Sequence, residues 1–139
     1  MFKKIFNKKE ESSDKYVLIC ALLIHAAKID NIYSEDEKKI IKKAIINLDQ
    51  SNLNEIETIL EKAEKKEEES NQILEFTKEI KKYPFDFRLK IIEILWKIVY
   101  SDGTNDIYES NLIRRVCGLL YISDKDNGII KLRVKKNLE

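Results

Sequence analysis

Two short stretches of the chain carry acidic side chains at the same spacing. In each, an aspartate follows an apolar helical pattern, and a glutamate comes seven residues later as a second apolar pattern begins. The pairs are Asp30 with Glu37 and Asp102 with Glu109, and they lie 72 positions apart. Carboxylate oxygens are the ligands that hard divalent cations such as Ca²⁺ and Mg²⁺ prefer. These spacings therefore make cation binding the first chemistry to consider.

The later acidic stretch predicts a helix, a tight turn and another helix. Asp102-Gly103 interrupts an apolar helical stripe, and glycine readily adopts the left-handed conformation that ends helices. Asp106 followed by Glu109 has the spacing of a capping box, in which the two residues satisfy free amides at a helix start. We therefore expect a new helix to begin beside Asp106.

The earlier stretch follows the same order of features. Asp30-Asn31 comes at the end of an apolar helical pattern, and asparagine also tolerates the left-handed conformation. Ser34 and Glu37 then form a second predicted capping box. Two helix–turn–helix units in one chain indicate an internal repeat with two related halves.

An EF-hand calcium loop is excluded at both turns. Such a loop would need oxygen ligands two and four positions before the aspartate. Those positions hold Tyr100 and Ile98 before Asp102, and Lys28 and Ala26 in the earlier copy. What stays open is a looser site of oxygen ligands, assembled from both turns.

Two interpretations of the acids remain open. If the halves pack around a pseudo-two-fold axis, five carboxylates meet at one end of the protein and hold Ca²⁺ or Mg²⁺. These candidate metal ligands are Asp30, Glu37, Asp102, Asp106 and Glu109. In the alternative, the aspartates only form turns and the glutamates only cap helices. The basic residues expected to pair with acids of the other half are Lys42, Lys43, Arg114 and Arg115.

Composition predicts an all-α protein without a nucleic-acid partner. Lysine and arginine number 26 and acidic residues 25, so the basic excess of a nucleic-acid binder is missing. Only three glycines and one proline interrupt a chain rich in helix-forming residues. We expect a single-domain helical bundle of about six to seven helices over residues 14–138. The expected helix starts are Ser12 or Ser13, Ser34, Asn54, Asp86, Asp106 and Ser123.

Other reactive side chains do not form a catalytic pattern. His25 is the single histidine, and no cysteine and histidine spacing typical of a zinc site surrounds it, so we expect a structural or surface role. Cys20 and Cys117 lie in apolar patterns, which favours buried, reduced thiols in a cytoplasmic protein. The charge-dense run at 61–69 is expected to be a solvated helix surface. We therefore predict that the chain is not an enzyme; carboxylate-based acid–base catalysis is a remote alternative.

Residues 1–13 form a separate N-terminal segment with two interpretations. Phe2, Ile5 and Phe6 share one side of a short helical pattern that also contains four lysines. The segment is either a docking element for a membrane surface or a partner, or a flexible end that folds back on the domain. No apolar run approaches the length of a membrane span.

At the two turns the chain resembles the TerB-like family, named for bacterial tellurite-resistance proteins. The match comprises an apolar helix running into Asp102-Gly103, then Glu109 and an Ile113-Arg114-Arg115 helix, with a weaker earlier copy around Asp30.

The resemblance implies a cytoplasmic all-helical bundle of two related halves, with turn acids proposed to bind a divalent metal. It also implies links to stress-response or membrane-associated complexes and hence a protein partner. A metal-free helical scaffold or adaptor is the alternative function. Lys28 departs from an acidic site, because its charge could neutralise the earlier turn.

Overall fold

The structure is a computed structural model that describes residues 2–30, 33–70, 72–101 and 107–137. The side chains of residues 2–13, 30 and 107–109 lie outside this description. Every regular element in the described ranges is helical, which confirms the all-α prediction. The α-helices are α1 (Phe2–Ala27), α2 (Glu35–Leu48), α3 (Ile56–Glu69), α4 (Leu74–Ile80), α5 (Phe85–Tyr100), α6 (Ile107–Leu119) and α7 (Asp124–Asn137). Two 3₁₀ helices, η1 (Lys28–Asp30) and η2 (Gln50–Glu55), lie between them.

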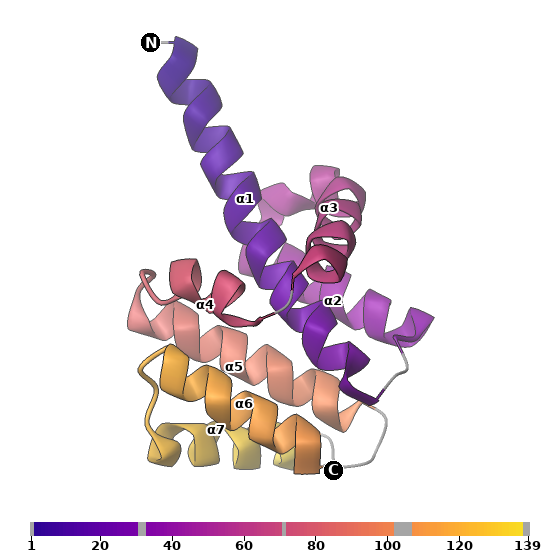
Figure 1. Ribbon diagram of the computed structural model, residues 1–139, viewed down its shortest axis with the longest axis vertical. Helices are drawn as coiled ribbons and strands as arrows, with labels where there is room; N and C mark the ends of the chain where they lie inside the picture. The colour runs from indigo at the N-terminus through magenta and orange to yellow at the C-terminus, as the bar shows by residue number, and fades with distance from the viewer. Residues whose placement is uncertain (1, 31–32, 71, 102–106, 138–139) are drawn as a thin grey trace.

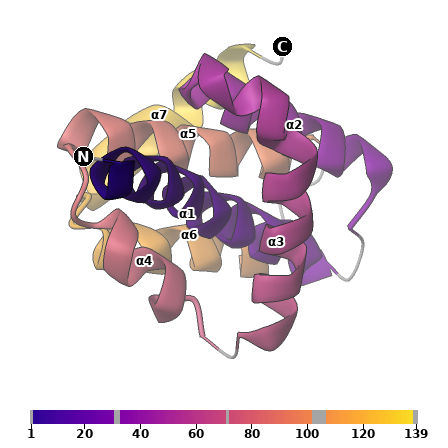
Figure 2. The same cartoon turned by 90° about the horizontal axis from the view of Figure 1, so that it is seen from above.

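Helix α1 is the central element of the bundle. It packs against α2, α3, α4 and α5, and Figure 2 shows these helices arranged around it. The stretch from Ile19 to Ile24 is fully buried, because it is apolar on every side and has no face suited to water. Helices α5, α6 and α7 form a second packed group beneath it (Figure 1).

The start of α1 differs from the prediction. The helix begins at Phe2 and continues through Ser12 and Ser13, so neither serine caps it. The physical reason is that residues 2–13 contain no glycine or proline, so nothing in this stretch interrupts the helix. Figure 1 shows the first turns of α1 projecting beyond the rest of the bundle.

Two further predicted caps are wrong. Asn54 does not start α3; instead the Asp49 side chain accepts a hydrogen bond from the Ser51 amide at 3.0 Å and begins η2. Helix α5 begins directly after Pro84, which places Asp86 inside the first turn. Pro84 occupies the N-cap position, and its ring has no hydrogen-bonding group, so α5 begins without a side-chain cap.

The turn from α6 to α7 is a Schellman motif closed by an unusual residue. The Ile122 amide donates to the Cys117 carbonyl at 2.9 Å, and Tyr121 between them has a φ of 59°. Ser123 then caps α7 as predicted, because its hydroxyl accepts from the Asp126 amide at 3.1 Å. Local hydrogen bonds therefore fix where α7 starts.

The core is shared by both groups of helices, because a single cluster of buried apolar side chains includes residues of α1 to α4 and of α5 to α7. Trp96 of α5 is 2% exposed, and its indole nitrogen donates to the Asn127 side chain of α7 at 2.9 Å.

In the described part of the chain, none of the helices combines the length and apolar character that crossing a membrane requires.

Candidate functional site

The helix ends that flank the two predicted turns lie at one end of the molecule. Helices α1 and α5 finish there, and α2 and α6 start there (Figure 1). The 3₁₀ helix η1, which ends at Asp30, contacts α6 directly. We call this end of the bundle the turn pole, comprising residues 25–30, 33–38, 98–101 and 107–115.

A hollow at the turn pole is lined by both halves of the chain. His25 and Ile29 contribute from the first half, and Asn111, Leu112 and Arg115 contribute from α6. Its volume is about 410 Å³. The elements on either side of the turns are therefore neighbours in space.

The five predicted ligands are described to different degrees. Glu37 lies in α2 and its side chain is described. Asp30 ends η1 and Glu109 lies in α6, but their side chains are outside the described residues. Asp102 and Asp106 lie outside the described residues altogether. The five-carboxylate arrangement therefore stays a prediction.

Glu37 acts as the predicted helix cap. Its Oε1 atom accepts from the Ser34 amide at 3.0 Å and from the Ser34 hydroxyl at 3.1 Å. In return, the Ser34 hydroxyl accepts from the Glu37 amide at 3.1 Å. This reciprocal pairing satisfies amides at the start of α2 and holds Glu37, a residue that is only 8% exposed, at the turn pole.

An ion-pair cluster joins the end of α1 to α3. Lys28 Nζ donates to Glu67 Oε2 at 2.7 Å, and His25 Nδ1 lies 3.3 Å from Glu67 Oε1. The Glu67 side chain is 10% exposed, so water screens these contacts less than it would on an open surface. The charge of Lys28 is thus compensated by α3, and the contact of His25 with Glu67 agrees with the structural role predicted for it.

A second cluster holds the segment before α2 against α3. The Tyr33 hydroxyl donates to Glu64 Oε1 at 3.3 Å, and Lys38 Nζ lies 3.9 Å from the same oxygen. Lys38 also lies 5.0 Å from the centre of the Tyr33 ring. Burial first, and the Glu64 charge second, raise the pKa of Tyr33, so its hydroxyl stays protonated and can donate.

The prediction of a solvated surface for residues 61–69 holds for most of the run but not for the face that meets α1. The exposed residues are Glu61, Lys62, Lys65, Lys66, Glu68 and Glu69. One face of that run packs on α1, with Ala63 fully buried and Glu64 and Glu67 engaged by cations. A signal for this was present in the sequence. Ile59, Ala63 and Glu67 recur every four residues, which places Glu67 on the buried face of α3.

The predicted charge pairing between halves is wrong where it is described. Lys42 Nζ lies 2.7 Å from Glu57 Oε1 of α3, within the first half. Arg114 Nη2 lies 3.9 Å from Asp124 Oδ2 of α7, within the second half. The reason is that α3 packs beside α2, and α7 beside α6, so acids on the neighbouring helix are closer.

The two cysteines are buried and unpaired, as predicted. Burial, with a smaller contribution from Glu64, raises the pKa of Cys20 to about 12. Burial and Asp124 raise the pKa of Cys117 to about 12 in the same way. Because the thiolate is the nucleophilic and metal-binding form, both thiols are inert near neutral pH.

Within the described ranges, no three histidine, cysteine or acidic side chains gather closely enough to hold a metal ion. The turn pole, where it is described, contains the capped carboxylate of Glu37, the exposed acids Glu35 and Asp36, the paired Lys28, and a hollow lined by apolar and polar side chains. This arrangement suits binding through charge and shape.

The helices and their packing place the chain among the all-α bundle proteins. A family model described as tellurite resistance protein TerB matches residues 17–132, so the chain belongs to the TerB family. Searches of curated proteins and of solved structures each gave no match. The family match confirms the resemblance drawn from the two turns.

Proposed function

We propose that this TerB-family chain is a non-enzymatic binding module that holds a divalent cation at the turn pole and engages a protein partner. The candidate ligands are the carboxylates of Asp30, Glu37, Asp102, Asp106 and Glu109. Ca²⁺ and Mg²⁺ are the cations whose preference for oxygen ligands this set fits. The observation that carries the proposal is the contact between η1 and α6, which brings the ends of both turns to one pole.

The pairing of Lys28 with Glu67 adds support. Lys28 is two residues before Asp30, and an uncompensated ammonium there would oppose cation binding. Its short contact with Glu67, at 2.7 Å, instead ties that charge to α3. The negative charge contributed by the turn acids is thereby less offset by Lys28.

The proposal of binding without catalysis is supported by the state of the reactive groups. Both thiols are protonated near neutral pH because burial raises their pKa to about 12. The lone His25 contacts Glu67 and so serves to join α1 to α3. The unpaired thiols also support the proposed cytoplasmic location.

A metal-free scaffold that docks through its N-terminal segment is the second candidate. The observation that favours it is the projection of the first turns of α1 beyond the bundle (Figure 1). Phe2, Ile5 and Phe6 would share one face of that helix by their spacing. Deleting residues 1–13 would then abolish partner binding without changing any response to cations.

Calorimetric titration of the full chain with Ca²⁺ and with Mg²⁺ tests the cation proposal. We expect saturable heat and a raised melting temperature, because a ligand that binds only the folded state adds about 2.7 kcal/mol of stability at 100 times its Kd. Absence of heat together with an unchanged melting temperature at excess cation would contradict the proposal.

Matched variants locate the site. We expect Asp30→Asn and Asp102→Asn each to weaken cation binding about tenfold or more, because each removes one charged oxygen ligand. Asp86→Asn is the control, since Asp86 is an exposed acid in the first turn of α5, at the other end of that helix. Equal weakening by all three variants would indicate a general charge effect and no specific site.

A further inference from the structure

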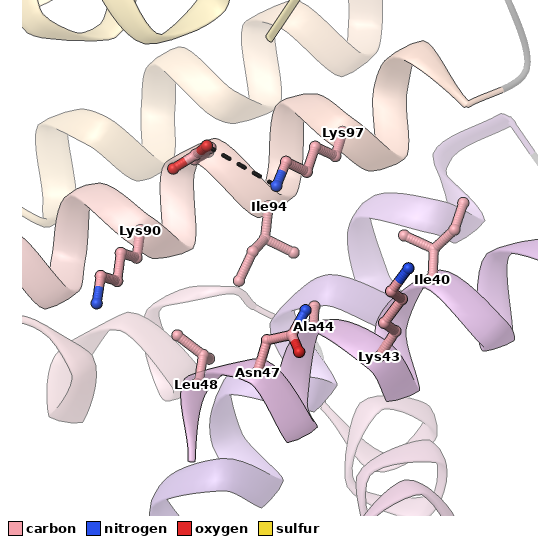
Figure 3. Close-up of a pocket in the computed structure, with 9 residues that line it drawn as sticks. Ile40, Lys43, Ala44, Asn47, Leu48, Lys90, Ile94 and Lys97 are labelled. Atoms are coloured by element: carbon pink, nitrogen blue, oxygen red, sulfur yellow. Dashed lines mark ion pairs between the residues drawn. The ribbon is translucent and has the colours of Figure 1, made fainter. Parts of the chain in front are cut away.

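A solvent-open groove runs between α2 and α5, separate from the hollow at the turn pole. Its volume is about 390 Å³. The apolar side chains on its floor are Ile40, Ala44 and Leu48 of α2 and Ile94 of α5. In Figure 3, Ile94 points from α5 toward Ala44, and the polar side chains stand around this apolar strip.

Lysines stand at both ends of the floor. Lys90 lies beside Leu48 at one end, whereas Lys43 and Lys97 lie nearer Ile40 at the other (Figure 3). Lys43 and Lys90 are exposed and have no ion-pair partner among the residues that the structure describes.

The one acid in the groove does not cancel this charge. Glu93 Oε1 lies 3.8 Å from Lys97 Nζ, and Glu93 Oε2 lies 3.5 Å from Arg133 Nη2. Glu93 is therefore shared between two cations of its own surroundings. Lys43 and Lys90 leave the two ends of the groove positively charged.

We propose that the groove between α2 and α5 binds an acidic amphipathic helix of a partner protein. Apolar side chains of that helix would cover Ala44 and Ile94, and its carboxylates would pair with Lys43 and Lys90. This inference rests on the partner-binding part of the proposed function and is independent of the cation.

The length of the floor fits a helix. The nine residues of α2 from Ile40 to Leu48 extend over about 12 Å along the helix axis, or slightly more than two helical turns. A helix laid along it presents apolar residues at i, i+3, i+4 and i+7 toward the floor and acids on its flanks. It can therefore use the lysines at both ends.

The charge of the groove favours an acidic partner helix over two other ligands, a small anionic amphiphile and the chain's own N-terminal segment. An amphiphile with one anionic headgroup would engage the lysines at one end only. The chain's own N-terminal segment is unsuited, because Lys3, Lys4, Lys8 and Lys9 would meet groove lysines of the same sign. Charge complementarity thus selects an acidic segment from another protein.

The test uses the full chain, EDTA and a fluorescein-labelled synthetic helix of about four turns, with leucines on one face and glutamates on the flanks. We expect saturable binding in low salt, with backbone amide NMR shifts concentrated at Ala44, Asn47, Leu48 and Ile94. Affinity should fall about tenfold or more on raising salt from about 50 to 500 mM, because exposed charge pairs are screened.

Variants assign the contact. Lys43→Glu combined with Lys90→Glu should weaken binding about tenfold or more, whereas Lys62→Glu, at an exposed lysine of α3, should leave it within about twofold. Ala44→Trp should also weaken binding by filling the floor. Because Lys43 and Lys90 are exposed, their double variant keeps the test valid if Ala44→Trp does not fold.

Three results would overturn the proposal. The first is that the acidic helix shows no saturable binding in low salt. The second is that Lys62→Glu lowers the affinity as much as the groove variants do. The third is that decanoate, and not the acidic helix, shifts the amide NMR signals of the groove. The last result would assign the groove to a small amphiphile. Helix binding in EDTA without any cation response in calorimetry would keep this inference and reject the cation proposal.

Discussion

At the scale of single residues, Tyr121 has a backbone conformation that its side chain disfavours. Its φ is 59°, it is 71% exposed, and the Tyr121 amide approaches the Gly118 carbonyl at 3.4 Å in the Schellman turn. The turn requires the left-handed conformation, and glycine adopts it without the steric cost of a β-carbon.

We expect Tyr121→Gly to raise the free energy of unfolding by about 1 kcal/mol, measured by urea denaturation. Tyr121→Ala is the matched control, because it removes the ring and keeps the β-carbon strain. If both variants change stability equally, the effect comes from the ring and the strain argument fails.

The buried thiols predict how stability depends on pH. The unfolded chain loses thiol protons near the ordinary pKa of 9.0, while the folded chain keeps them until about 12. A raised pKa in the folded state contributes stability below pH 9 that is lost as pH rises toward 12. Each thiol lowers the free energy of unfolding by up to about 1.4 kcal/mol per pH unit in that window.

Urea denaturation at a series of pH values from neutral upward measures this loss. The raised pKa values of Tyr16 and Tyr33 act in the same direction. Cys20→Ala combined with Cys117→Ala should flatten the alkaline slope even though it lowers stability at neutral pH. An unchanged slope in that double variant would show that the thiols do not cause the loss.

At the scale of elements, one largely buried acidic side chain, Glu67, links α3 to the end of α1 in addition to their apolar packing. Glu67 contacts Lys28 and His25, whereas its neighbour Glu68 is exposed on the same helix. The two glutamates therefore form a natural matched pair for separating a specific contact from charge alone.

We expect Glu67→Gln to lower the free energy of unfolding by about 1 kcal/mol, because a charge-assisted hydrogen bond is replaced by a neutral one. Glu68→Gln should change it by less than about 0.5 kcal/mol. Thermal unfolding followed by circular dichroism measures both. A loss in the Glu68 variant as large as that in the Glu67 variant would contradict the specific contact.

The elements also show where sequence patterns were sufficient. The Ser34–Glu37 box and the break at Pro84 were predicted, because each depends on residues that are adjacent in sequence. The start of α1 was not predicted correctly, because serine occurs both at helix caps and inside helices. The helix continues back to Phe2 because no glycine or proline before Ser12 interrupts it.

At the scale of the whole molecule, the pattern predicted the all-α fold and the family but not the pairing of charges. Apolar periodicity determines which faces are buried, so the bundle follows from it. The partners of Lys42 and Arg114 depend on which helices lie side by side, and no spacing within one helix contains that information. The site assignment of the five turn acids and the internal repeat stay predictions.

The groove between α2 and α5 was missed for the same reason. Lys43 and Lys90 are far apart in sequence, and Lys43 was expected to pair with an acid of the other half. Only the packing of α2 against α5 places them at the ends of one apolar floor (Figure 3). Functional surfaces assembled from two elements thus need the structure.

The central claim is that the two turns form one cation site, and Mn²⁺ tests it most directly. Mn²⁺ accepts the same oxygen ligands as Mg²⁺ and broadens the NMR signals of nearby amides. We predict that substoichiometric Mn²⁺ broadens Ile29 and Ser34 beside the first turn together with Ser101 and Ser110 beside the second, and that excess Mg²⁺ reverses the effect. Broadening confined to one turn, or spread evenly over exposed acids, would contradict a shared site.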